Sequence, residues 1–169
     1  MTAKVRGLGA MVLAVLLRCA HPPPAVLFEP YSRTLEALEP VNLRLPPGGL
    51  AGRVVVVQFF ATYCFPCLSM LPKLTELQSR YGRQGFLALG VGMDLEGRQM
   101  LAPFAEHYQL PFPVLLPSES IRAGTSAFGP IQTLPSTVVL DRYGHPVSAF
   151  PGVVTAPVLD ALVRAVLQT

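Results

Sequence analysis

The sequence is poor in metal-ligating residues, with only three cysteines and three histidines among 169 residues. A closed structural zinc site takes four ligands, usually a second cysteine pair or a pair of histidines. Cys64 and Cys67 form the only close pair, and His21, His107 and His145 are scattered without ligand spacing. We therefore expect no structural metal.

Charged residues are also scarce, at 14% against 51% hydrophobic residues, which argues against intrinsic disorder. The net charge of +3 comes from Lys4, Arg6 and Arg18, because the other 10 basic residues are matched by 10 acidic ones. A nucleic-acid partner therefore has no electrostatic support. We also find no internal repeat and no phosphate-cradling glycine loop.

Residues 1–20 are typical of an export signal. Lys4 and Arg6 supply the positive start, and Leu8 to Leu17 form an apolar run of ten residues. As a helix this run would be about 15 Å long, roughly half of a bilayer core. A buried core helix is the alternative, but the "HPPP" at 21–24 breaks the chain. We expect export to the periplasm or cell envelope.

The stretch "LLRC" at 16–19 partly resembles the cleavage site of bacterial lipoproteins. A small residue normally precedes the lipidated cysteine, but Arg18 stands there. Either Cys19 is lipidated and attaches the protein to the membrane, or it is lost with the signal or stays as an ordinary thiol. We expect a proline-rich linker over 21–37 and one domain over 38–169.

Hydrophobic patterning predicts an α/β domain with a mixed sheet between helices. The run "RVVVVQFF" is apolar enough for a central strand that is covered on both faces. A last helix begins after Thr155, with an apolar stripe of Val158, Leu159, Leu162, Val163 and Val166. We predict strands over 53–60, 85–93, 136–141 and 146–150, a short one near 41–45, and helices over 65–81 and 96–108.

The spacing of Cys64 and Cys67 allows a redox pair, half of a metal site, or a structural disulfide. A structural disulfide is disfavoured, because so short a loop constrains the unfolded chain little. Cys64 falls where a strand ends and a helix begins, a position that favours the nucleophilic thiolate. Cys67 lies one turn further, where it can attack a mixed disulfide at Cys64. Pro66 suits the first helical turn. We interpret the pair as redox-active.

The segment "VVVVQFFATYCFPCLSMLPKL" resembles the active-site segment of thioredoxin-like proteins, especially the exported TlpA and ResA type. Pro72 matches the proline that kinks their first helix, and residues 112–152 resemble their distal half. The resemblance implies a thioredoxin fold in which Pro135, after Leu134, is a cis-proline facing the two cysteines.

The resemblance also implies an enzyme, a thiol–disulfide oxidoreductase that needs no cofactor. Cys64 would be the nucleophile and Cys67 the resolving cysteine, tuned by Tyr63, Phe65 and Pro66. Leu134 and Pro135 would hold the backbone of a partner. The expected partners are protein disulfides, such as those of cytochrome or copper-site precursors, and an upstream thiol donor. We expect a monomer that acts as a reductant.

The sequence departs from this family at several positions. It has no tryptophan, whereas family members usually carry tryptophan at the positions of Phe60 and Tyr63. Gln58, six residues before Cys64, replaces an acid or asparagine, and Met70, six residues after it, replaces a frequent glutamate. These changes leave the dithiol chemistry intact but remove carboxylates that relay protons.

Two other functions fit parts of the pattern less well. A copper-handling module of related fold would bind metal through both cysteines and a histidine, but its usual cysteine spacing is one residue longer. A peroxidase would use one peroxidatic cysteine, and the adjacent Cys67 and the missing threonine-rich loop argue against it.

Overall fold

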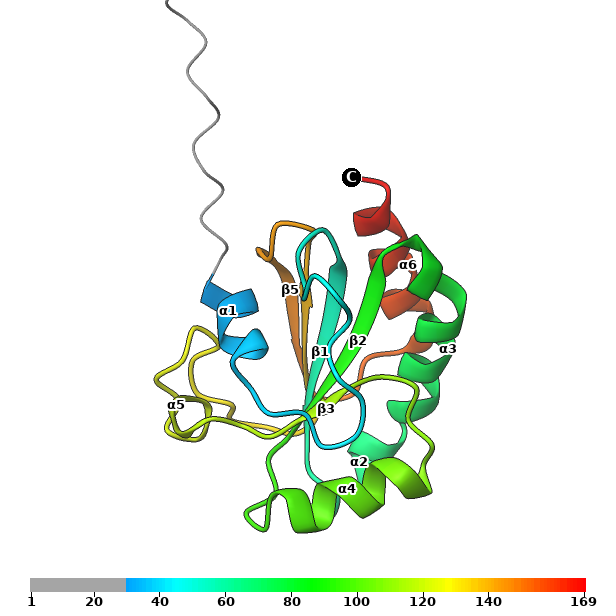
Figure 1. Ribbon diagram of the computed structural model, residues 1–169. Helices are drawn as coiled ribbons and strands as arrows, with labels where there is room; N and C mark the ends of the chain where they lie inside the picture. Colours follow the sequence, from blue (N-terminus) through cyan, green and yellow to red (C-terminus); the bar gives the residue numbers. More distant parts are fainter. Residues whose placement is uncertain (1–29) are drawn as a thin grey trace, which may run out of the picture.

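The computed structural model describes residues 30–169 and contains one five-stranded sheet, in the order β3-β2-β1-β4-β5 (Figure 1). Strands β1, β2 and β3 are mutually parallel, whereas β4 pairs antiparallel with β1 and with β5. This confirms the predicted mixed sheet. The strands are β1 (Val54–Phe60), β2 (Phe86–Gly92), β3 (Val114–Leu115), β4 (Ser136–Leu140) and β5 (Pro146–Pro151).

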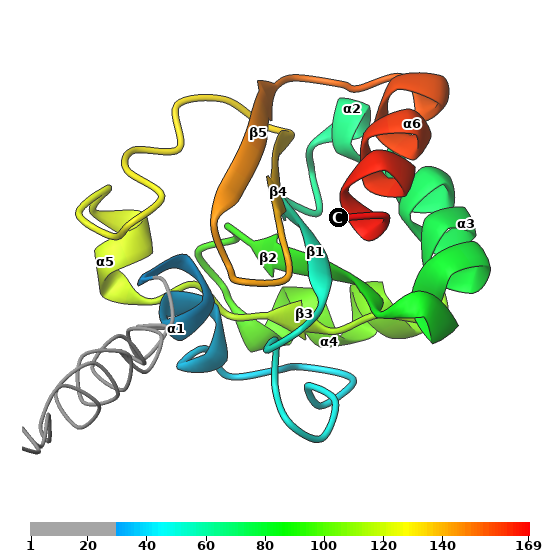
Figure 2. The same cartoon turned by 90° about the horizontal axis from the view of Figure 1, so that it is seen from above.

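Helices cover both faces of the sheet, as Figures 1 and 2 show. Helices α3, α4 and α6 contribute to the core on one face, and α1 and α5 contribute to the core on the other. The helices are α1 (Pro30–Glu36), α2 (Phe65–Leu68), α3 (Leu71–Tyr81), the 3-10 turn η1 (Gly82–Gln84), α4 (Arg98–His107), α5 (Glu119–Arg122) and α6 (Ala156–Leu167).

Strand β1 is the centre of both cores. All seven of its residues are buried, as the nearly continuous apolar run predicts for a strand between two helical layers. Successive side chains point to opposite faces, so Val56 and Phe60 join one core while Val55 and Phe59 join the other.

Glycine at the end of β2 lets α4 lie directly on the sheet. A Cβ atom at Gly92 would lie far inside contact distance of the Leu101 side chain, which is fully buried. Helix α4 therefore packs tightly at the end of the sheet where the cysteines lie, which fixes the start of the loop that follows β2.

The predicted helix over 65–81 is wrong in one respect, because it is divided. Helix α2 ends at Leu68 and α3 begins at Leu71. Pro72 has no amide hydrogen, and its ring excludes the carbonyl four residues earlier, so the helix cannot run through this point. The predicted end of the helix is confirmed, because α3 ends at Tyr81 with Gly82 as its C-cap. The 3-10 turn η1 follows and is capped by Gly85, whose φ of +86° suits glycine.

The segment before the sheet also differs from the prediction. The predicted linker lies within the described residues only from position 30, and there it forms α1, in which Ser32 and Leu35 are buried. The predicted strand near 41–45 is not formed and is replaced by a single bridge between Pro40 and Leu115. Proline has no N–H to donate, which limits pairing here. Residues 1–29, with the predicted export signal and Cys19, lie outside the described residues.

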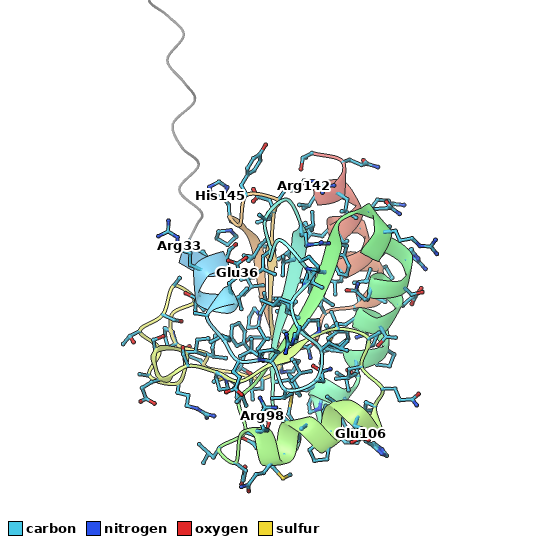
Figure 3. All side chains as sticks on the ribbon, viewed as in Figure 1. Arg33, Glu36, Arg98, Glu106, Arg142 and His145 are labelled. Atoms are coloured by element: carbon cyan, nitrogen blue, oxygen red, sulfur yellow. A yellow bond between two sulfur atoms is a disulfide. The ribbon has the colours of Figure 1, made fainter. Side chains whose placement is uncertain are left out.

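The hairpin turn after β4 closes the end of the molecule away from α2 and α4. Its Arg142 donates to the carbonyls of Gly52 and Leu167 at 2.9 and 3.0 Å, which joins the start of β1 to the end of α6. Figure 3 shows Arg142 and His145 at this end. Within residues 30–169, no helix has the length and apolar character that a membrane crossing requires.

The apolar stripe of α6 is confirmed except at Val158, which is 50% exposed, whereas Val163 is fully buried. We predict that Val163→Ala lowers the free energy of unfolding by about 2 kcal/mol, because it removes two buried methyl groups and leaves a cavity. Val158→Ala on the same helix should change it by no more than about 0.5 kcal/mol. Urea denaturation of the oxidised protein measures both. Equal losses would contradict the assigned packing of α6.

Candidate active site

The two cysteines lie just beyond the carboxyl end of β1. The chain turns at residues 61–63, where the amide of Cys64 donates to the carbonyl of Ala61 at 3.0 Å. Cys64 then caps α2, and its Sγ accepts a hydrogen bond from the amide of Cys67 at 3.3 Å. The two Sγ atoms form a disulfide, 2.05 Å long.

The two sulfurs differ in access. Cys64 is 9% exposed and Cys67 only 1% exposed. Tyr63 and Phe65 flank Cys64 in the chain and are 77% and 83% exposed, so two aromatic side chains are open to solvent beside the more exposed cysteine. A partner can therefore approach Cys64, while Cys67 stays covered by the core. Pro66 occupies the first turn of α2, as predicted.

The Leu134–Pro135 peptide bond is cis, which confirms the bond expected from the family resemblance. Ser136 pairs with Phe59, so Pro135 lies beside the end of β1 that leads to Cys64. The carbonyl of Pro135 accepts from the amide of Gly152 at 2.7 Å, which ties it to the end of β5. The fold thus brings Pro135 to the same end of the sheet as the cysteines.

The two departures from the family's carboxylates are both deeply buried. Gln58 and Met70 have no exposed surface. Neither polar atom of the Gln58 amide, nor the hydroxyl of Thr137 opposite it on β4, has a hydrogen-bond partner within residues 30–169. Buried polar atoms normally find partners in protein or ordered water. This uncharged polar pair faces the core that contains Cys67.

A cation lies beside Met70, where the family often has a carboxylate. The Nζ atom of Lys73 is 3.6 Å from Met70 Sδ and donates to the carbonyl of Val154 at 2.8 Å. The sequence analysis missed Lys73. Its spacing of three residues from Met70 was the available signal, since such residues are neighbours on a helix.

The sequence analysis also missed Asp94, a buried carboxylate that accepts hydrogen bonds from the amide and hydroxyl of Thr62. The order of strands and loops could have indicated this contact. Asp94 follows β2 and Thr62 follows β1, and the carboxyl ends of adjacent parallel strands meet at one edge.

The described residues contain no group of three or more histidines, cysteines or acids placed to hold a metal ion. His107 ends α4, where its ring packs edge-on against Tyr108 at 4.9 Å between centroids.

Residues 38–145, more than half of the chain, match the AhpC/TSA family. The chain belongs to the AhpC/TSA family. Its thioredoxin-like fold agrees with solved structures. A thiol:disulfide interchange protein of Chlorobium tepidum is 27% identical, with a TM-score of 0.61 over 70% of this chain and 82% of that one. A thiol-disulfide isomerase of Corynebacterium glutamicum, 23% identical, has a TM-score of 0.66 over 78% and 92% and supports the fold alone.

The chain is also similar in sequence to proteins named as thiol-disulfide oxidoreductases or as thioredoxin-like. The thiol-disulfide oxidoreductase ResA of Halalkalibacterium halodurans is 27% identical over 132 residues, or 78% of this chain and 72% of the relative. The ResA of Bacillus cereus is 28% identical over 117 residues, which cover 69% and 65%. The thioredoxin-like protein YneN of Bacillus subtilis is 29% identical over 94 residues, which cover 55% and 53%. The chain thus spans less than two thirds of the last two.

The unequal exposure of the two sulfurs generates a prediction. After reduction, one equivalent of iodoacetamide should label Cys64 more than Cys67, because Cys64 is the more exposed of the two residues. Peptide mass mapping of the labelled protein measures the ratio. The same reaction in denaturant, where both thiols are exposed, is the control and should label both. Preferential labelling of Cys67 in the folded protein would contradict the assigned geometry.

Proposed function

We propose that this protein is a thiol–disulfide oxidoreductase that exchanges disulfides with protein partners through Cys64 and Cys67. The observation that carries the proposal is the disulfide-bonded pair of unequal exposure, Cys64 at 9% and Cys67 at 1%, at the same end of the sheet as Pro135. The names of the curated relatives support the same activity.

The reaction takes two exchange steps. The Cys64 thiolate attacks one sulfur of a partner disulfide, which forms a mixed disulfide and releases the other partner sulfur as a thiolate. The Cys67 thiolate then attacks Cys64 Sγ, closes the Cys64–Cys67 disulfide and releases the second partner sulfur. Two electrons pass from the Cys64–Cys67 dithiol to the partner. The two protons lost by the cysteines balance the two taken up by the partner thiolates, so the partner ends as a dithiol. An upstream thiol donor then reduces Cys64–Cys67 again.

The residues around the pair have supporting roles in the proposal. Tyr63 and Phe65 offer apolar contacts to the partner beside the reacting sulfur. Pro66 stiffens the first turn of α2 without the loss of a backbone hydrogen bond. The half-buried Leu134 and the buried Pro135 shape the end of the sheet against which an extended partner segment lies in the proposal.

We propose that the protein is exported to the cell envelope and that it reduces the disulfides of its partners. The charge and apolar run of residues 1–20 favour export to the cell envelope, with membrane attachment if Cys19 is lipidated. The resemblance to the TlpA and ResA type favours a reductant, and the substrate class that we propose is the disulfides of cytochrome or copper-site precursors. We propose that the protein works as a monomer.

Titration of the reduced protein with Cu(I) tests the copper-handling alternative, which requires tight binding through both thiols.

The roles of the two cysteines can be separated by trapping. Cys64→Ser should abolish reduction of a model protein disulfide, because the accessible nucleophile is gone. Cys67→Ser should accumulate mixed disulfides through Cys64, because no second thiol resolves them. Non-reducing gels of both variants after incubation with partner proteins provide the measurement, and a double serine variant is the control. Adducts that form mainly in Cys64→Ser would reverse the assignment.

The buried Gln58 generates a prediction about proton transfer. An amide cannot ionise, so the rate of disulfide reduction should rise with pH through the cysteines alone. Gln58→Asp places a carboxyl in the same core, where burial raises its pKa towards neutral pH. Above that pKa the carboxylate accepts a proton, so the rate near neutral pH should rise several-fold.

A pH–rate profile of the wild type, Gln58→Asp and the neutral Gln58→Asn provides the measurement. An additional inflection is expected in Gln58→Asp but not in the wild type or Gln58→Asn. Met70→Glu should also show it. A carboxylate-like inflection already in the wild type would show that another acid handles the proton.

A further inference from the structure

The turn that precedes Cys64 is fastened to the loop that follows β2. The amide of Met93 donates to the carbonyl of Phe60 at 2.7 Å, just beyond the paired strands. The amide of Thr62 then donates to both carboxylate oxygens of Asp94, each at 3.1 Å, and the Thr62 hydroxyl donates to one of them. The contact therefore holds the chain two residues before the sulfur that meets the partner.

Asp94 is only 1% exposed, and burial of a carboxylate is costly unless hydrogen bonds compensate it. Each of its carboxylate contacts comes from a donor, as an ionised carboxylate requires. Arg122 of α5 donates to the backbone carbonyls of Met93 and Asp94, at 3.4 and 2.9 Å. The Arg122 side chain thus holds the loop, while the carboxylate itself is directed to Thr62.

We propose that Asp94 is a positioning residue of the cysteine site. Its carboxylate fixes the turn from Thr62 to Cys64, and its negative charge opposes the Cys64 thiolate, which makes the reduced pair a stronger reductant. This inference rests on the proposed function, whose direction it explains.

The electrostatic effect follows from distance. Cys64 follows Thr62 by two residues, and its amide donates back to the carbonyl of Ala61, so the turn keeps the Cys64 sulfur close to the carboxylate that binds Thr62. Like charges this close disfavour each other, and burial weakens screening by salt. A less stable thiolate makes the reduced form less favourable, so electrons leave it more readily. Charged groups of neighbouring elements are Arg122, the exposed Glu96 of the same loop, Arg98 at the start of α4, which pairs with Glu39, and Lys73 beside Met70.

Asp94→Asn tests this proposal, because asparagine keeps an oxygen for Thr62 and removes the charge. We measure the pH dependence of iodoacetamide alkylation of Cys64 in the full chain, with Cys67→Ser in the background. The midpoint of Cys64 ionisation should fall by about half a pH unit to one unit. Below the midpoint, alkylation should accelerate only about two- to threefold, since a more stable thiolate is less nucleophilic. In the protein with both cysteines, the equilibrium with glutathione should shift towards the reduced form.

Glu96→Gln is the matched control, because it removes a carboxylate from the same loop that faces solvent, and its midpoint should equal that of the wild type. Thr62→Val provides a second test if Asp94→Asn does not fold. Without the hydroxyl donor, the carboxylate charge is less compensated, so the midpoint should rise.

Alkylation needs no turnover, so its result is separate from the proposed function. If the wild type fails to reduce protein disulfides but Asp94→Asn still shifts the midpoint, the function is wrong and the role of Asp94 stands. Equal midpoints in the wild type and Asp94→Asn, or in the wild type and Thr62→Val, would overturn the role of Asp94.

Discussion

The site depends on one constraint, the enclosure of strand β1. Both faces of β1 are buried, and both of its edges are paired with neighbouring strands. From Val54 to Phe60 every backbone position is flanked by β2 or β4, and every side chain lies in a core. The chain can leave the sheet only after Phe60, and there it turns into α2 and the cysteines. Parallel pairing with β2 brings Asp94 to this edge, and antiparallel pairing with β4 brings Pro135. The site is thus assembled by the pairing of a single strand.

Much of the fold could be predicted because its signals are local and strong. The apolar run of β1, the hairpin turn with a glycine at φ +85° and the stripe of α6 each follow from a few adjacent residues. Helix α1 could not be predicted, because it is short and is held by tertiary contacts such as the edge-to-face packing of Tyr31 on Phe128. Pro72 indicated that the first long helix is divided. The prediction of one helix over 65–81 followed the spacing of its leucines instead.

The same distinction explains the site. The cysteine pair is a local motif, and the family resemblance identified Pro135 although it is far away in the sequence. Lys73 and Asp94 were not predicted, because each acquires its contact only from a residue that the fold brings near. Lys73 contacts Val154, and Asp94 contacts Thr62. A single charged residue has no pattern of its own. Only the pairing of β1 with β2 makes Asp94 part of the site.

The charges around the pair differ from those that the family resemblance implies. In the core that holds Cys67, Gln58 and Met70 are neutral where related proteins can carry an acid, and Lys73 lies beside Met70. The buried acid instead stands before Cys64. In the proposed mechanism the accessible sulfur need not be the more stable thiolate, because its exposure alone selects it to meet the partner. Lys73, beside Met70, adds a positive charge to that side of the core. In the proposal, the Asp94 charge disfavours the Cys64 thiolate that forms when the pair is reduced. That charge therefore drives the exchange towards the closed Cys64–Cys67 disulfide and a reduced partner.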